Sequence, residues 1–121
     1  MGRNQQLGGA LGGEDLAAEF LESIGMTVLE RNWRCRYGEL DLIARDGAVL
    51  VFVEVKTRTG FGYGSPPAEA VTPAKADRIR RLAGLWLTEQ QTRWRRIRVD
   101  VVTVLVVDGN APMITHLKQV L

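Results

Sequence analysis

The stretch from Tyr37 to Arg58, with the sequence YGELDLIARDGAVLVFVEVKTR, decides the expected fold. It predicts two strands, at about residues 39–45 and 48–56, joined by a two-residue turn at Asp46-Gly47. Asp-Gly is a dipeptide favoured in tight hairpin turns because its residues tolerate positive φ. The stretch is therefore interpreted as a β-hairpin.

The register of this hairpin predicts one apolar face and one mixed face, because side chains alternate along each strand. The expected partners are Arg45 with Ala48, Ile43 with Leu50, Asp41 with Phe52, and Glu39 with Glu54. The apolar face would hold Leu40, Leu42, Ala44, Val49, Val51, Val53 and Val55.

The open end of the mixed face would carry Glu39, Asp41, Glu54 and Lys56. Opposite Cβ atoms in such a pair lie about 5 Å apart, so three carboxylates and one ammonium would share a patch. Like charges beside a core repel strongly, and a hard divalent cation such as Mg²⁺ would compensate them. Alternatively, Glu54 and Lys56 form an ion pair at a strand end and Asp41 is solvated.

The rest of the chain predicts an α/β protein with a mixed five-stranded sheet flanked by helices. Residues 1–10 are expected to be a flexible N-terminus, and residues 11–121 a single domain. The remaining predicted elements, in order, are a helix from Gly12 or Gly13 to Ser23, a strand at 26–33, a loop at 57–72, a helix at 73–90, a strand at 96–107 and an edge strand at 113–118.

Glu14 borders the apolar stripe of the first predicted helix and can turn toward the core. That stripe consists of Leu16, Ala17, Phe20, Leu21 and Ile24. An acid in the first helical turn also stabilises the helix dipole, which is a sufficient structural reason for its presence. Both interpretations stay open from the sequence.

Basic side chains are concentrated in the second half of the chain. Eight basic and two acidic residues lie between Lys75 and Arg98. Such a run is often a solvated face, but next to an acidic metal patch it favours a phosphate-backbone ligand. Aromatic side chains on the long loop could stack on bases, or simply anchor the loop. The candidate nucleic-acid-binding residues are Arg58, Lys75, Arg78, Arg81, Phe61 and Tyr63.

Composition narrows the class of protein only broadly. The 121 residues carry a net charge of +2, and Cys35 is the sole cysteine, which excludes an internal disulfide. Neither an apolar run long enough to cross a membrane nor a secretory segment is apparent, so a cytoplasmic location is expected.

Two polar residues near the end of the chain are assigned structural positions. Asp100 interrupts an apolar strand and is expected to bond backbone or an arginine, or else to approach the acidic patch. His116, the only histidine, is expected to be an exposed edge residue. Trp86 and Trp94 are expected to pack in the core or at its rim.

Asp41 followed after twelve residues by Glu54-Val55-Lys56 resembles the D…(D/E)xK signature of the PD-(D/E)XK nuclease superfamily. Glu14 is similar in placement to the helical acid of the archaeal Holliday-junction resolvases in that superfamily. The chain as a whole resembles the YraN-type family of bacterial predicted endonucleases, through GEDLA at 13–17, NWR at 32–34, GELDLI at 38–43, FVEVKTR at 52–58 and DVV at 100–102.

The resemblance implies a restriction-endonuclease-like core, a metal-dependent endonuclease activity on DNA and a role for each acid. Asp41, Glu54 and Glu14 would ligate Mg²⁺, with Mn²⁺ as a substitute, and Glu39 would support them from a second sphere or act as an alternative ligand. Lys56 would position or deprotonate the attacking water. Branched or junction DNA is the implied substrate, and cutting both strands of a junction would involve a homodimer.

Two rival functions are consistent with the same residues. A non-catalytic nucleic-acid-binding protein could retain the nuclease fold. A protein-interaction module could use the acidic patch only as a cation site, although the basic block would then have no evident purpose.

Overall fold

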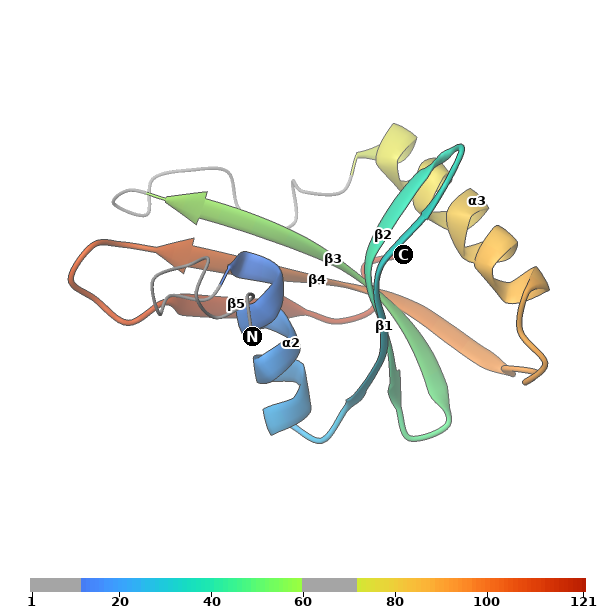
Figure 1. Ribbon diagram of the computed structural model, residues 1–121, viewed down its shortest axis with the longest axis horizontal. Helices are drawn as coiled ribbons and strands as arrows, with labels where there is room; N and C mark the ends of the chain where they lie inside the picture. Colours follow the sequence, from blue (N-terminus) through green and yellow to red (C-terminus); the bar gives the residue numbers. More distant parts are fainter. Residues whose placement is uncertain (1–11, 60–71) are drawn as a thin grey trace.

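The computed structural model describes residues 12–59 and 72–121, which form two helices and five strands (Figure 1). In chain order these are α2 (Gly13–Ser23), β1 (Thr27–Cys35), β2 (Gly38–Asp46), β3 (Val49–Thr59), α3 (Pro73–Thr88), β4 (Arg96–Val106) and β5 (Met113–Leu117). The expected order of helices and strands is confirmed.

The five strands form one mixed sheet in the order β1-β2-β3-β4-β5. β3 and β4 are parallel and are connected through α3, whereas the other neighbouring pairs are antiparallel. β5 lies at an edge of the sheet, as predicted. The α/β class and the nuclease-like mixed sheet flanked by helices are therefore confirmed.

Each helix covers its own hydrophobic cluster. Ala17, Ala18 and Leu21 of α2 pack with Leu42, Val53 and other apolar residues of the sheet. The second cluster gathers residues of α3 and the sheet: Trp33, Leu40, Ile43, Leu50, Phe52, Ile79, Leu82, Ala83, Trp86 and Val99. Trp86 meets Phe52 edge-on with ring centroids 5.7 Å apart, which confirms its expected place in the core.

The predicted hairpin register is wrong by two residues. Asp46 pairs with Val49 and Ile43 with Phe52, so the turn is Gly47-Ala48 rather than Asp46-Gly47. Gly47 has φ +60° at the first central position, where a type II′ turn requires glycine. Because the shift is even, residues keep their predicted faces near the turn.

The face predicted for Leu40 is also wrong. The pairing of β2 with β3 ends at Leu42 and Val53, after which β2 continues as a two-stranded hairpin with β1. This hairpin runs alongside α3 in Figure 1. Leu40 consequently packs in the cluster with Leu82, while Leu42 lies in the cluster under α2.

Several predicted details at the ends of elements are corrected. β3 continues through Thr59 and β1 through Cys35, so the loop starts later and the β1–β2 connection is only a short turn. Ile24 is 48 % exposed because it follows the last turn of α2. Phe61, Tyr63 and the expected flexible N-terminus at 1–10 lie outside the described residues.

The prediction that His116 is exposed is wrong, because its side chain is only 7 % exposed and its Nε2 lies 2.8 Å from Asp100. Asp100 is fully buried and also accepts hydrogen bonds from Arg98 and from the backbone N–H of Gln119. The structural role expected for Asp100 is confirmed. Within residues 12–59 and 72–121, neither helix is long and apolar enough to cross a membrane.

Candidate functional site: an acidic group beside two lysines

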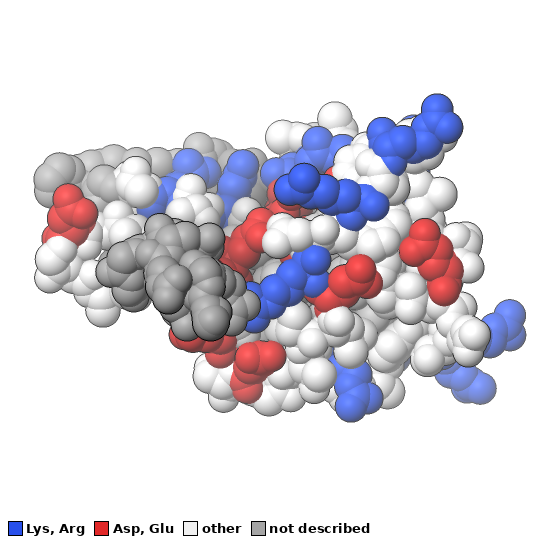
Figure 2. Space-filling model, in the orientation of Figure 1, with Lys and Arg blue, Asp and Glu red and all other residues white. Residues whose placement is uncertain are grey.

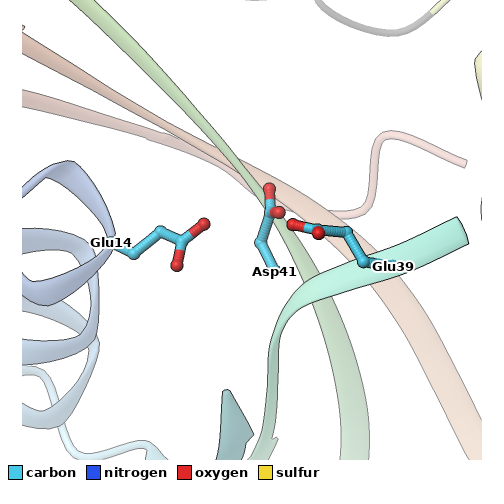
Figure 3. Close-up of side chains that lie close together, drawn as sticks. All are labelled: Glu14, Glu39 and Asp41. Carbon is cyan, nitrogen blue, oxygen red and sulfur yellow. The ribbon is translucent and has the colours of Figure 1, made fainter. Parts of the chain in front are cut away.

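Three carboxylates converge where the start of α2 meets β2. Oxygen atoms of Glu14, Glu39 and Asp41 all lie within 4.8 Å of one another, close enough to share one metal ion. Figure 3 shows the Glu14 side chain extending from the helix toward Asp41, with the Glu39 carboxylate beside it. Glu39 thus lies in the group itself, a position that matches the alternative-ligand role expected for it rather than the second-sphere role.

Asp41 is the central member of this group. Its Oδ2 accepts a 2.9 Å hydrogen bond from the backbone N–H of Val55, which fixes the side chain against β3. Its pKa is raised from 3.8 to about 6, chiefly by burial and also by the charges of Glu54, Glu14 and Glu39, against the lowering effect of the Val55 bond. The site therefore holds more negative charge than its surroundings neutralise.

Glu14 lies in the first turn of α2, and its pKa is raised by burial and by Glu39 and Asp15, while a side-chain bond from Asn32 lowers it. Asn32 has φ +52° within β1, in the left-handed region that is uncommon for residues other than glycine. Glu14 therefore both occupies the favourable end of the helix dipole and turns toward Asp41.

Glu54 comes from β3 and lines the same cavity as Asp41. Its Oε2 lies 2.7 Å from Nζ of Lys75, and both side chains are largely buried, at 14 % and 17 % exposed. The structure thus places Glu54 beside the acidic group but neutralised by a lysine of α3. This partner differs from the Lys56 partner considered from the sequence.

Lys56 lies close to Lys75, and that neighbouring charge is the main cause of its lowered pKa, with burial adding to the effect and Glu54 opposing it. A lysine with a lowered pKa loses its proton more readily than a free lysine. Two ammonium groups, from β3 and from α3, therefore stand next to Glu54 at the edge of the acidic group.

A cavity of about 510 Å³ adjoins the acidic group. Its lining includes Glu39, Asp41 and Glu54 on the acidic side and Arg34 and Arg78 on the basic side. Figure 2 shows basic side chains next to acidic ones on one face of the molecule. This mixture suits a ligand that carries phosphate groups and bridges both signs of charge.

The predicted basic residues divide into different settings. Arg78 lines the cavity, Lys75 pairs with Glu54, and Arg81 stacks over the ring of Tyr37 with its Cζ 4.2 Å from the centroid. Among the described residues, Nε of Arg58 is buried without a hydrogen-bond partner. Arg78 and Lys75 therefore lie next to the acidic group, whereas Arg81 lies further along α3, over the ring of Tyr37.

Sequence reasoning missed three contributions to this site. The side chain of Asn32 forms a hydrogen bond with Glu14. Nε of Arg34 lies 3.1 Å from Oε1 of Glu39. Lys75 forms an ion pair with Glu54, so it is not free to bind a ligand. No local pattern marks an asparagine at positive φ in a strand, or an ion pair between residues 21 positions apart. Only the position of NWR, at residues 32–34 in the strand predicted next to the hairpin, could have indicated that Asn32 and Arg34 lie near the site.

The fold and site define an α/β protein with a mixed sheet and a carboxylate group that could hold a metal ion at the junction of helix and sheet. The chain belongs to the family described as "Uncharacterised protein family UPF0102", whose sequence profile matches residues 13–104. The resemblance to the YraN-type family is confirmed by this match.

Curated relatives cover nearly the whole chain. A "UPF0102 protein" of Nocardia farcinica is 60% identical over 120 residues, spanning 99% of this chain and 92% of the relative. One from Mycolicibacterium gilvum is 58% identical over 114 residues, with 93% and 91% covered. One from Mycobacterium avium is 59% identical over 110 residues, with 89% and 85% covered.

Proposed function

We propose that this protein is a Mg²⁺-dependent endonuclease that hydrolyses phosphodiester bonds of DNA. The observation that carries the proposal is the convergence of Glu14, Glu39 and Asp41, with Glu54 in the same cavity as Glu39 and Asp41 and two lysines next to Glu54. The raised pKa of Asp41 supports it, because a cation is the group that would relieve so much negative charge. A cytoplasmic location, where bacterial DNA lies, belongs to the same proposal.

The donor set fits a hard divalent cation. Mg²⁺ binds carboxylate oxygens and retains several waters, and Mn²⁺ accepts the same ligands. Asp41, Glu14 and Glu54 would hold the ion, and the position of Glu39 adds it as a further ligand. When bound, such an ion supplies a counter-charge for the phosphate and a water that is readily deprotonated near neutral pH.

To hydrolyse a phosphodiester, the protein must position a water molecule and stabilise the negative charge that develops on the phosphoryl oxygens. The water oxygen forms a bond to phosphorus, the bond from phosphorus to one sugar oxygen breaks, and a proton passes from the water to that leaving oxygen. Lys56 is proposed to position the water and to stabilise negative charge on the phosphoryl oxygens. Its lowered pKa also suits it to accept and return the proton.

The basic residues are proposed to hold the DNA backbone. Arg78 lines the cavity together with Asp41, and Arg58 follows Lys56 on β3. Arginine recognises phosphate oxygens through paired hydrogen bonds. Branched or junction DNA is the proposed substrate, and a homodimer would place two sites for cuts in two strands.

One observation favours a second candidate, a nucleic-acid-binding protein without catalysis. Glu54 is bound to Lys75, and a carboxylate neutralised in this way attracts a metal ion less strongly. In the nuclease proposal this ion pair must open or rearrange when the cation binds. In the alternative it persists, and the basic residues bind DNA without cutting it.

A cleavage assay separates the two candidates. Labelled branched and linear DNA of equal length would be incubated with the protein in Mg²⁺, Mn²⁺ or EDTA. We expect cutting in either metal and none in EDTA, and a loss of about 100-fold or more in Glu54→Ala and Lys56→Ala. Binding in EDTA should change by only a few fold, because neither residue is proposed to provide most backbone contacts.

The matched control is Glu89→Ala, which removes an exposed carboxylate at the end of α3. It should cut like the parent protein. If Glu54→Ala and Lys56→Ala also cut like the parent, the assigned roles are wrong. If the parent binds but never cuts, the non-catalytic candidate is supported.

A further inference from the structure

An exposed tyrosine stands beside the acidic cavity at the turn between β1 and β2. Tyr37 is 45 % exposed, although large aromatic rings are usually covered in folded proteins. Its backbone N–H donates to Sγ of Cys35 at 3.4 Å, so the turn that carries the ring has a defined conformation. The ring is therefore held at the surface by an ordered turn.

Two arginines from different elements lie over this ring. The guanidinium carbon of Arg81, on α3, is 4.2 Å from the ring centroid, and that of Arg36, in the turn, is 5.3 Å away. Such contacts stabilise a planar stack of cation and aromatic ring. The arrangement presents flat, positively charged surfaces that are ordered before any ligand arrives, which lowers the entropy lost on binding.

A second cavity, of about 290 Å³, lies between this turn and α3. It is lined by Tyr37, Asp77, Arg78, Arg81 and Leu82. Leu82 provides an apolar surface, while Asp77 and the arginines provide an acceptor and donors. A Cβ at Gly38 would come within 3.4 Å of Leu82, so the turn and the helix approach each other closely here.

The second cavity adjoins the acidic one. Tyr37 and Arg78 line both cavities, and the larger one also contains Asp41 and Glu54. A ligand with a phosphate at Arg78, joined to Asp41 through the proposed cation, could therefore place an attached flat ring at Tyr37. A nucleotide has this layout, since its base and its phosphate are joined through one sugar.

We propose that the Tyr37 cavity is a nucleobase subsite, which takes an unpaired base of the DNA strand whose phosphate lies at the acidic group. This inference rests on the proposed nuclease function and defines its substrate class. Bases stack on aromatic rings and on arginine planes, and such stacking tolerates any base sequence. In an intact duplex the bases are paired and stacked inside, so only an unpaired or extruded nucleotide can reach the subsite.

Binding measurements with three DNA ligands test the subsite. Fluorescence anisotropy in EDTA would compare a single strand, a fork with unpaired arms and a fully paired duplex of equal length. For Tyr37→Ala we expect about 10-fold to 100-fold weaker binding of the single strand and the fork, and little change for the duplex. Tyr37→Phe keeps the ring and should restore binding.

Arg81→Gln and Arg45→Ala form a matched pair. Each removes one positive charge, but only Arg81 contacts the Tyr37 ring, and Arg45 is exposed near the β2–β3 turn. Arg81→Gln should weaken binding of unpaired DNA more than binding of duplex, whereas Arg45→Ala should affect all three ligands alike. Because Tyr37 is exposed in a turn, its loss should leave the melting temperature nearly unchanged.

A crosslink locates the base directly. Single-stranded DNA carrying 5-iodouracil would be irradiated with the protein, and the attached peptide identified by mass spectrometry. We expect attachment at Tyr37. Attachment elsewhere, together with equal losses for unpaired and duplex DNA in Tyr37→Ala, would overturn the subsite.

The outcomes also separate this inference from the proposed function. Metal-dependent cutting without a Tyr37 preference for unpaired DNA would overturn the subsite and leave the nuclease intact. A Tyr37-dependent preference without cutting would support the subsite and contradict the nuclease.

Discussion

The environment of Asp41 suits a metal ligand but is unfavourable for a carboxylate that has no cation beside it. Its carboxylate is fixed by the backbone N–H of Val55 and surrounded by Glu14, Glu39 and Glu54. Burial and these like charges raise its pKa to about 6. A residue placed for stability alone would be expected to avoid such an environment, which is why the acidic group points to a ligand.

The raised pKa of Asp41 predicts a pH-dependent effect of Asp41→Asn on stability. A carboxyl whose pKa is higher in the folded chain than in the unfolded chain stabilises the fold when protonated, and this contribution is lost as the pH rises from about 4 through about 6. Asparagine stays neutral and keeps an oxygen for the Val55 N–H. At pH 8 without metal, Asp41→Asn should therefore be more stable than the parent by about 1–2 kcal/mol, discounted for solvent exposure.

Urea unfolding of both proteins at pH 8 and pH 4.5, in EDTA, measures this effect. The advantage of Asp41→Asn should shrink to less than half at pH 4.5, because most of the parent's Asp41 is then protonated in the folded state. An advantage that is the same at both pH values, or a less stable variant at pH 8, would contradict the electrostatic account of the site.

Asp100 has a different role, although it is also buried and acidic. Its carboxylate accepts hydrogen bonds from Arg98 and from the N–H of Gln119 and lies against His116, so it joins β4 to β5 and to the end of the chain. Removing it leaves Arg98, which is 14 % exposed, with Asp46 as its remaining acidic partner. Asp100→Ala should lower the free energy of unfolding by about 3 kcal/mol or more.

The control for this prediction is Asp108→Ala, which removes an exposed carboxylate next to the β4–β5 turn. It should change the free energy of unfolding by less than about 0.5 kcal/mol. Equal effects of the two substitutions in urea unfolding would show that Asp100 does not hold these strands together.

At the scale of elements, the position of α2 determines where Glu14 meets the sheet. Gly13 begins the helix directly against β3, and a Cβ at this position would collide with the side chain of Thr57. Because Thr57 is β-branched, one rotamer change would still leave crowded atoms. The close approach of helix and strand thus depends on the missing side chain of Gly13.

Gly13→Ala should therefore displace the start of α2 and weaken the acidic group. We expect it to cost about 1–3 kcal/mol of stability from overpacking, and to reduce metal-dependent cutting because Glu14 moves with the helix. Gly84→Ala is the matched control, since Gly84 lies in α3 with open space around its Cβ position. That variant should be more stable by about 0.5–1 kcal/mol, with cutting unchanged.

Thermal unfolding and the cleavage assay measure both glycine variants. We expect that replacing glycine by alanine lowers the stability of the protein in α2 and raises it in α3. If Gly13→Ala is as stable and as active as Gly84→Ala, the contact between α2 and β3 does not position Glu14.

For the whole molecule, patterns of apolar residues and turn signals were enough to predict the elements and the sheet. The helix predicted from residue 73 does begin at Pro73, and the Thr72 hydroxyl accepts a hydrogen bond from the N–H of Lys75 at this end. The hairpin register failed because both Asp46-Gly47 and Gly47-Ala48 are acceptable turns, and the type II′ geometry of Gly47 decides between them.

The candidate site was only partly predictable for a related reason. Asp41 and Glu54 line one cavity, although the pairing of β2 with β3 ends at Leu42 and Val53, so the predicted register does not account for their meeting. The pairing of Glu54 with Lys75 depends on how α3 crosses the sheet, which no local pattern encodes. His116 was misjudged because its buried partner, Asp100, lies 16 positions away on a neighbouring strand.

Binding of a divalent cation shows most directly whether the carboxylates around Asp41 form a metal site. Mn²⁺ would be titrated into the parent protein and Asp41→Asn, and the free ion measured by electron paramagnetic resonance, with Glu89→Ala as the control. We expect that the parent and Glu89→Ala take up Mn²⁺ that Mg²⁺ displaces, and that Asp41→Asn loses this binding. Equal uptake by the parent and Asp41→Asn, or no uptake by either, would contradict this expectation.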